Sequence, residues 1–332
     1  MMEDKIYSTN YHQTDVSDVS ILLTGGAGFI GSNILEYLIT FGFKKVYVLD
    51  NLSSGFVKNI EKFIGSQVEF IEGDIRDFDL VSDLTKKVDY VIHQAALGSV
   101  PRSINAPLPS HDSNINGFLN VLEASRLNGV KRMVYASSSS VYGDHPALPK
   151  KEENTGNPLS PYAVTKCVNE LYANVYHSVY GFKVLGLRYF NVFGPNQSPE
   201  GQYAAVIPLF VDAILNGKQA NIHGDGEQTR DFTFVENAVQ ANIRALFTSD
   251  EEAFGKAYNV AYGERYTVNE LYQSIAQGLN SDIQPNYVET RKGDIKNSLA
   301  DISLAKKHLG YQPRFSMAEG IDIALKWYKE NL

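Results

Sequence analysis

Tyr162 and Lys166 are the pair of residues whose types and spacing best suit proton transfer. They stand four positions apart in a segment that predicts a long helix, which begins at Ser160 and Pro161 and ends at Gly181. Both side chains therefore share one helix face. A free tyrosine has a pKa of about 10, and we expect the neighbouring ammonium to stabilise the phenolate and lower that pKa. The pair alone is a weak signal, because the chain contains 20 tyrosines.

A glycine-rich turn predicts a phosphate-binding site. Gly25, Gly28 and Gly31 separate the apolar run VSILLTG from a helical pattern. Glycine permits the positive φ of a tight turn and the close approach of a pyrophosphate, which a helix N-terminus attracts. Asp50 ends the next apolar run, 19 residues after Gly31. An acid there accepts hydrogen bonds from the ribose hydroxyls of adenosine and repels a 2′-phosphate, so the turn predicts NAD rather than NADP.

Further cofactor contacts are expected where other apolar runs end. Asp74 and Ile75 fall near the expected adenine site, although Asp74 also fits a plain helix cap. Lys166 can hold the nicotinamide ribose, and the positive nicotinamide would further stabilise a Tyr162 phenolate. The complete predicted cofactor set is Gly25, Gly28, Phe29, Ile30, Gly31, Asp50, Asn51, Ser53, Gly55, Asp74, Ile75, Gln94, Ala95, Ala96, Asn114, Tyr162, Lys166 and Tyr189.

The elements that must position these residues are six apolar runs separated by helical segments. The runs cover residues 19–25, 44–50, 68–74, 88–96, 131–139 and 182–190. Nearly continuous apolar strands that alternate with helices predict a parallel sheet covered on both faces. We therefore predict an α/β fold with a doubly wound Rossmann parallel sheet at 19–190. An N-terminal extension at 1–18 precedes it, and a smaller C-terminal α/β substrate lobe at 191–332, partly interleaved with the sheet, follows.

Composition excludes several classes of protein. The 332 residues carry a net charge of −8, and the absence of a basic stripe argues against nucleic-acid binding. No apolar run reaches the roughly 18 residues of a membrane span, and the polar start does not resemble a secretory signal. The single cysteine, Cys167, fits a structural role in a reducing cytoplasm. No His, Cys and carboxylate cluster has metal-ligand spacing, and His93 is expected to be structural, so we predict no metal.

Several motifs together resemble the extended short-chain dehydrogenase/reductase family. They are TGGAGFIG, Asp50, SSSSVYGD, Y-x-x-x-K and LRYFNVFGP, and the similarity covers nearly the whole chain from about residue 18. HQAALGSVPRS, SPYAVTK and SLADIS more narrowly resemble the bacterial UDP-N-acetylglucosamine 4-epimerases of polysaccharide biosynthesis. This resemblance implies tightly held NAD, a UDP-sugar substrate, and a homodimer formed by the helices near 113–128 and 162–180.

The resemblance gives a meaning to the serines at the end of the run 131–139. The related dehydratases carry an Asp-Glu pair just before the Val-Tyr-Gly, and related decarboxylases carry a glutamate there. This chain has Ser138, Ser139 and Ser140 instead. A serine is too weak to be the general acid that elimination needs, so proton transfer at one hydroxyl remains. Ser138 matches the family's catalytic serine, and Ser139 and Ser140 are expected to shape the pocket.

The resemblance also implies a set of substrate contacts. Arg230 and Arg291 match the two arginines that bind the diphosphate, a role that suits the guanidinium fork. Ser298 matches a position that is a bulky tyrosine in galactose-type epimerases, so it leaves room for a 2-acetamido group. Gly98 replaces a lysine of those epimerases and leaves one cofactor contact unassigned. The predicted substrate-binding residues are Ser99, Ser138, Ser139, Asn191, Gln197, Ala205, Arg230, Arg291 and Ser298.

The predicted reaction is NAD-dependent C4 epimerisation of UDP-GlcNAc or UDP-GalNAc. Tyr162 takes the C4 hydroxyl proton, directly or through Ser138, the hydride moves to NAD, and the 4-keto sugar turns before both return. Alternatives are an epimerase of UDP-glucose/UDP-galactose or of the uronic acid UDP-GlcNAcA. A dehydratase is disfavoured by the serines, and a non-catalytic NAD-binding regulator is disfavoured by the intact Tyr162/Lys166 pair.

Overall fold

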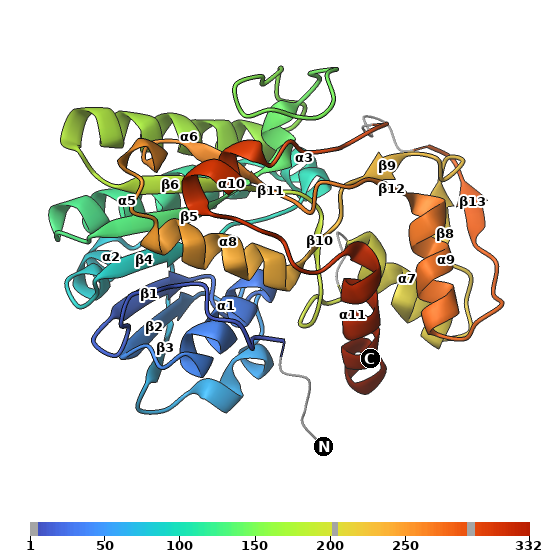
Figure 1. The fold of residues 1–332 in the computed structure, drawn as a ribbon, viewed down its shortest axis with the longest axis horizontal. Helices are drawn as coiled ribbons and strands as arrows, with labels where there is room; N and C mark the ends of the chain where they lie inside the picture. Colours follow the sequence, from blue (N-terminus) through green and yellow to red (C-terminus); the bar gives the residue numbers. More distant parts are fainter. Residues whose placement is uncertain (1–5, 201–204, 291–295) are drawn as a thin grey trace.

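The computed structural model describes residues 6–200, 205–290 and 296–332 as a parallel sheet flanked by helices, with a smaller lobe at one end (Figure 1). The strands are β1 (Ser20–Thr24), β2 (Lys45–Asp50), β3 (Val68–Glu72), β4 (Tyr90–His93), β5 (Arg132–Ser138), β6 (Val184–Tyr189), β7 (Val192–Phe193), β8 (Asn221–His223), β9 (Thr229–Arg230), β10 (Thr233–Phe234), β11 (Ala257–Val260), β12 (Tyr266–Thr267) and β13 (Asn286–Val288).

The helices alternate with these strands in the first half of the chain and dominate the second. The α-helices are α1 (Phe29–Thr40), α2 (Phe78–Thr85), α3 (Val100–Asn105), α4 (Pro107–His111), α5 (Phe118–Leu127), α6 (Pro161–Tyr180), α7 (Val206–Leu215), α8 (Val235–Phe247), α9 (Val268–Gly278), α10 (Ser303–Leu309) and α11 (Met317–Asn331). Shorter helical turns are η1 (Val57–Asn59), η2 (Glu61–Phe63), η3 (Asp112–Gly117), η4 (Ser139–Tyr142) and η5 (Glu251–Ala253). Among the described residues, no helix is both long and apolar enough to cross a membrane.

The central sheet has the order β11-β6-β5-β4-β1-β2-β3, and all of its pairs are parallel. The predicted α/β class, the six strands and the doubly wound arrangement are therefore confirmed. The seventh strand, β11, was not predicted, because its run of four residues is too short for a reliable periodicity. The strand order reverses between β1 and β4, and ligands of such sheets bind at this switch point, beyond the carboxyl ends of the strands.

Two helical layers bury the faces of the sheet. Helices α2, α5 and α6 enclose one apolar core, and α1, α8 and α10 enclose the other. A third core lies in the smaller lobe, where α7, α9 and α11 pack together (Figure 1). Helix α8 and strand β11 come from the second half of the chain yet complete the central sheet layer, so the two halves interleave. The domain boundary at residue 190 stays a prediction.

The described part of the N-terminal segment, residues 6–18, packs against both halves of the molecule. The Tyr7 hydroxyl donates to Asn33 Oδ1 on α1 at 2.6 Å, and Asn33 Nδ2 donates to the Pro195 carbonyl at 2.9 Å. The Tyr11 hydroxyl donates to the fully buried carboxylate of Glu236 on α8. Both tyrosines are buried, so this segment is part of the packed structure rather than a loose extension.

Candidate active site

The end of β5 and the first turns of α6 bring Ser138, Tyr162 and Lys166 together. The Ser160 hydroxyl caps α6 by accepting from the Ala163 N–H at 3.1 Å, as its sequence position predicts. Ser138 and Tyr162 line the same cavity, and Ser138 lowers the pKa of the Tyr162 hydroxyl. Lys166 lies one turn further along the same face, and its ammonium donates to the Ala136 carbonyl at 2.7 Å. The predicted catalytic residues therefore meet at one strand end.

The electrostatics of Tyr162 are set mainly by burial. Burial raises the pKa of Tyr162, and the Ser138 side chain lowers it only in part. The Lys166 ammonium lies 5.8 Å from the centre of the Tyr162 ring and binds the Ala136 carbonyl. That Lys166 and a positive nicotinamide together lower the Tyr162 pKa stays a prediction. Burial also lowers the pKa of Lys166, to about 8. Tyr162 is a neutral phenol and becomes a base only when further positive charge comes beside it.

Three adjoining cavities surround these residues. The central cavity, of about 500 Å³, is lined by Ser138, Tyr162 and Lys166. A narrower one, of about 70 Å³, shares Gly25 and Gly28 with it and extends toward Asp50. A third, of about 580 Å³, shares residues 191, 192 and 197 with the central cavity and extends into the smaller lobe. The three cavities therefore adjoin one another, and Tyr162 lines the central one.

The glycine turn has the shape that a dinucleotide needs. Gly25 has a φ of 70°, and a Cβ on it would lie 2.5 Å from the Ala95 nitrogen, so the chain itself requires glycine there. Gly31 likewise packs against the Gly25 carbonyl. Gly28 differs, since a Cβ on it would meet only the Gly25 oxygen, at 3.2 Å, and the residue lines two cavities. A side chain at Gly28 would therefore fill space that a pyrophosphate can use.

Asp50 is held at the end of β2 and keeps hydrogen-bond acceptor sites for a ligand. Its Oδ2 accepts from the Ala27 N–H at 3.0 Å, and its Oδ1 accepts from the Leu52 N–H at 2.9 Å. Each oxygen keeps a second acceptor site, and the residue lines the narrow cavity. Burial raises the pKa of Asp50, so accepted hydrogen bonds from a ligand would favour its charged form. The residue fits the pair of ribose hydroxyls that NAD carries.

Asp74 is placed differently from the simplest expectation. The side-chain hydrogen bonds of Arg76 lower the pKa of Asp74 to about 2, and Asn51 Nδ2 donates to it at 2.7 Å. Its carboxylate is thus engaged by its neighbours, while Ile75 lines the narrow cavity. This favours an indirect role for Asp74 in shaping the adenine end.

A closed set of hydrogen bonds supports the floor of the central cavity. The Tyr189 hydroxyl donates to Gln94 Oε1 at 3.2 Å and accepts from Asn242 Nδ2 at 2.7 Å. Gln94 Nε2 donates to Asn242 Oδ1 at 3.0 Å, which completes the triangle. Sequence reasoning named Gln94 and Tyr189 but missed Asn242, because it lies 53 residues beyond Tyr189 on α8.

The substrate-side residues come from distant segments. Asn191, Gln197, Ala205 and Arg230 line the cavity of the smaller lobe. Asn191 has a φ of 35°, and its Nδ2 donates a hydrogen bond to the Asp231 carbonyl at 3.0 Å. The Oε1 atom of Gln197 is buried and has no hydrogen-bond partner among the described atoms. It is therefore available to a donor on a ligand.

Asp231 is a residue that the sequence reasoning missed. It is fully buried, and its Oδ1 accepts from the N–H groups of Tyr262 and Gly263 at 3.2 and 3.3 Å. Its Oδ2 accepts from the Ala300 N–H at 3.2 Å. Burial raises the pKa of Asp231 to about 7. Its position beside Arg230 was the available signal, but the contacts at residues 262, 263 and 300 have no local pattern.

Some predicted residues lie outside the walls of the three cavities. Gly55 packs against Ala27, and the Asn114 amide is used by the Leu97 backbone and Thr165. The Ser298 N–H donates to the Thr229 carbonyl at 3.1 Å, which places it beside the strand of Arg230. The set outside the walls is Gly55, Asp74, Asn114, Ser139 and Ser298. Arg291 lies outside the residues that the structure describes.

The other predicted residues do line the cavities. Ser99 lies on the wall of the central cavity. Arg102 lies on the same wall, although the sequence reasoning had not named it. Gly98 lies there too, and a Cβ on it would meet nothing within 4 Å. The remaining cofactor-side residues on the walls are Phe29, Ile30, Gly31, Asn51, Ser53, Gln94, Ala95 and Ala96.

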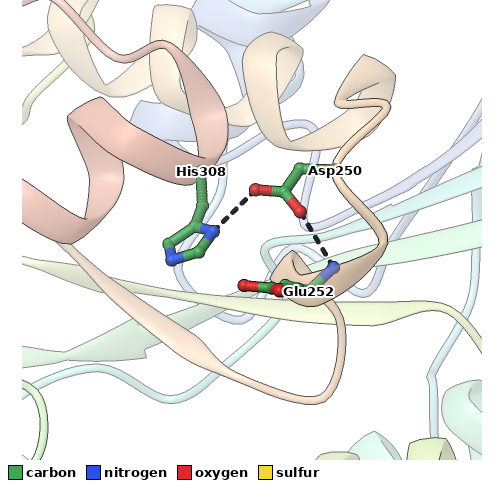
Figure 2. A group of neighbouring side chains, drawn as sticks. All are labelled: Asp250, Glu252 and His308. Atoms are coloured by element: carbon green, nitrogen blue, oxygen red, sulfur yellow. Dashed lines mark hydrogen bonds and ion pairs between the residues drawn. The ribbon is translucent and has the colours of Figure 1, made fainter.

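A group with the ligand chemistry of a metal site lies elsewhere. Within the described part of the chain, Asp250, Glu252 and His308 place their ligand atoms within 4.8 Å of one another (Figure 2). Asp250 Oδ2 pairs with His308 Nδ1 at 2.6 Å, and its Oδ1 accepts from the Glu252 N–H at 2.9 Å. These bonds explain the group as a link between α10 and η5. None of the three lines the cavities, and the absence of a metal stays a prediction.

The comparisons with known proteins agree with this geometry. Residues 21–261 match the NAD dependent epimerase/dehydratase family. The UDP-N-acetylglucosamine 4-epimerase of Methanobrevibacter ruminantium M1, solved with UDP-N-acetylmuramic acid, has 41% identity and a TM-score of 0.90, over 95% of this chain and 100% of that one. The UDP-glucose 4-epimerase of Mycolicibacterium smegmatis is 38% identical over 311 residues, 93% of this chain and 98% of that protein.

A further solved relative contains the cofactor. The UDP-glucuronic acid 4-epimerase of Bacillus cereus, solved with NAD and UDP-4-deoxy-4-fluoro-glucuronic acid, has 29% identity and a TM-score of 0.86, over 94% of this chain and 99% of that one. The sugars named for these relatives differ, whereas each name carries the UDP nucleotide. The match over most of the chain, together with the fitting dinucleotide site, shows that this chain belongs to the NAD dependent epimerase/dehydratase family.

Proposed function

We propose that the protein epimerises C4 of a UDP-N-acetylhexosamine, interconverting UDP-GlcNAc and UDP-GalNAc through a 4-keto sugar. One observation carries the choice of reaction. Ser138 and Tyr162 line the central cavity together, and among the described residues no Asp or Glu lines its wall. Elimination of a hydroxyl needs a general acid near the leaving group, whereas oxidation and re-reduction at C4 need one residue that takes and returns a proton.

The residues of this chain have separate roles in the proposed reaction. Bound NAD supplies the acceptor and donor of the C4 hydride. Tyr162 takes the C4 hydroxyl proton, directly or through Ser138, and returns it after the sugar presents its other face. Lys166 supplies a positive charge on the same face of α6 and can hold a ribose hydroxyl. Arg230 lines the far cavity, where its guanidinium suits the diphosphate about which the sugar turns.

The room around the sugar supports the acetylated substrate. Gly98 lines the central cavity where a larger residue would narrow it, and nothing lies within 4 Å of a Cβ placed on it. Ser298 is a small residue beside the strand of Arg230. Ser298 lies outside the walls of the three cavities, so its part in this argument comes from the family resemblance, in which galactose-type epimerases have a bulky tyrosine at this position. A glycine and a serine at these two positions support a sugar with a 2-acetamido group.

The decisive experiment is an NMR assay with three sugars. The purified protein is incubated without added cofactor with UDP-GlcNAc, UDP-Glc and UDP-GlcNAcA, and the H4 and anomeric signals are followed. We expect fastest conversion of UDP-GlcNAc. Conversion of none of the three would reject the epimerase, and preference for UDP-Glc would reject the assigned sugar.

Arg102 favours one alternative, a sugar that carries a 6-carboxylate. This cation lines the central cavity together with Ser99 and Tyr162. If the uronic acid is the substrate, Arg102→Gln should slow UDP-GlcNAcA far more than UDP-GlcNAc. Equal slowing of both sugars would remove this alternative.

The exposed face of α6 supports a homodimer. Val164, Leu171, Val175 and Val179 follow one another at helical spacing and are 46%, 67%, 48% and 65% exposed. We propose that α6 and α5 of one copy pack against those of another, in the way the family resemblance implies. Leu171→Glu combined with Val175→Glu should yield a monomer in light scattering, while Leu215→Glu on α7 should not. A double variant that keeps the wild-type mass would refute this interface.

We also infer a cytoplasmic location, which the single cysteine supports. Fractionation of cells that express the protein at its natural level would test it, and recovery from any other compartment would contradict it.

A further inference from the structure

Three successive residues at the end of β5 each lie beside a different residue of α6. The Ala136 carbonyl accepts from Lys166, and the Ser138 side chain lines the central cavity together with Tyr162. Between them, the Ser137 hydroxyl donates to Glu170 Oε1 at 2.5 Å. Positions 162, 166 and 170 are each one turn apart and so share one helix face. Each of them therefore lies against one of the three residues at the end of β5. Ser137 and Glu170 have no part in the reaction as described so far.

Glu170 is fixed more firmly than a surface carboxylate would be. Arg188 on β6 donates to it twice, from Nε to Oε1 at 2.9 Å and from Nη2 to Oε2 at 2.7 Å. The two side chains are only 6% and 16% exposed. Arg188 is held in turn by the Tyr142 hydroxyl, to which its Nη1 donates at 2.9 Å. A buried ion pair of this kind is a poor source of stability relative to apolar packing, so its position next to Lys166 invites a functional explanation.

The groups around Lys166 determine whether its amine carries a positive charge. Tyr135 is buried and Tyr162 is partly buried, and desolvation raises the pKa of each, so both are neutral. Burial lowers the pKa of His93 on β4 to about 3, so this side chain is neutral too. Arg188 is bound to Glu170 through two hydrogen bonds. Burial opposes the charge on Lys166, and Glu170 is the group that favours it.

We propose that Glu170, held by Ser137 and Arg188, is a positioning residue that keeps the Lys166 amine charged and aligned beside Tyr162. The proposal rests on the proposed function for the meaning of Lys166, but the charge state of Lys166 is measurable without any substrate. Ser137 thereby acquires a role distinct from that of Ser138: it orients the carboxylate that acts on Lys166.

The test follows the titration of Lys166 in Glu170→Gln. NMR of protein labelled with ¹³C-lysine, with the Lys166 signal assigned from Lys166→Arg, reports the pKa directly. A lysine that loses a negative neighbour loses its proton at lower pH, so we expect the midpoint to fall by about one pH unit. Turnover should fall with it at alkaline pH and change little at pH 6, because activity that needs the ammonium disappears as pH rises through the midpoint.

Matched variants separate this effect from general damage. Glu236→Gln removes another buried glutamate, on α8, that contacts an arginine and a tyrosine, and it should leave the Lys166 midpoint unchanged. Ser137→Ala keeps the charge of Glu170 and should shift the midpoint in the same direction by less, which serves if Glu170→Gln does not fold. An unchanged midpoint in both Glu170→Gln and Ser137→Ala would overturn the proposal. Absent turnover in the wild type would instead reject the proposed function while the titration still decides this inference.

Discussion

The two sides of the central cavity are built in different ways. The cofactor side consists of strand ends of one parallel sheet, where Gly25 follows β1, Asp50 ends β2 and Gln94 follows β4. The substrate side is assembled from short segments that one buried carboxylate, Asp231, ties together through residues 262, 263 and 300. A sheet fixes its edge by backbone pairing, whereas the substrate side depends on a few side chains. We therefore expect mutations to damage chemistry and cofactor binding on one side, and sugar choice and substrate affinity on the other.

Tyr162→Phe gives the largest expected effect and tests the point where the two sides meet. It removes the proton acceptor, so turnover should fall by about 10²- to 10⁴-fold. Bound NAD, measured by release and absorbance, should stay near the wild-type amount because the dinucleotide cavity is intact. Near-native turnover would show that the proposed proton path is wrong.

Asp50→Ala tests the cofactor side alone. Loss of charged hydrogen bonds to the two ribose hydroxyls should weaken NAD binding by about 10- to 100-fold. Calorimetry with protein stripped of NAD measures this directly. Asp225→Ala, an exposed carboxylate in the smaller lobe, provides the control. An unchanged dissociation constant would remove Asp50 from the cofactor site.

Ser298→Tyr tests sugar choice on the substrate side. A bulky ring beside the strand of Arg230 should lower kcat/KM for UDP-GlcNAc by about tenfold relative to UDP-Glc, a typical value for steric discrimination in a pocket. Assays with both sugars at equal concentration reveal the ratio. If the ratio stays constant, Ser298 does not border the acetamido group.

Asp231→Asn gives the smallest expected effect and tests whether the substrate side and the cofactor side are independent. The amide cannot accept hydrogen bonds at both of its ends, so at least one backbone N–H loses its partner, at a cost of about 1 kcal/mol. We expect KM for the sugar nucleotide to rise by about fivefold with the NAD affinity unchanged, because about 1 kcal/mol corresponds to that factor. A change confined to NAD affinity would mean that the two sides are not independent.

The sequence predicted the cofactor side of the central cavity better than the substrate side. The glycine turn between β1 and α1, Asp50 at the end of β2 and the 162/166 pair on α6 each have a local spacing that the sequence shows. The parallel sheet then brings these strand ends to one edge, where they line adjoining cavities. Local reasoning did not predict Asn242, Asp231 and Glu170, because each contacts a partner that only folding brings near. The position of Lys166 is a further example, because its ammonium is held by the Ala136 carbonyl, which sequence spacing does not reveal.

The N-terminal segment has a practical consequence for anyone who shortens this chain. The match to the family begins at residue 21, after the ring of Tyr11 has already covered the carboxylate of Glu236. A protein begun at that residue would open a buried acid to water and release the Asn33 amide that joins α1 to Pro195. The boundary of the recognisable sequence is thus not the boundary of the folding unit, and expression designs should retain the segment from residue 6 onward.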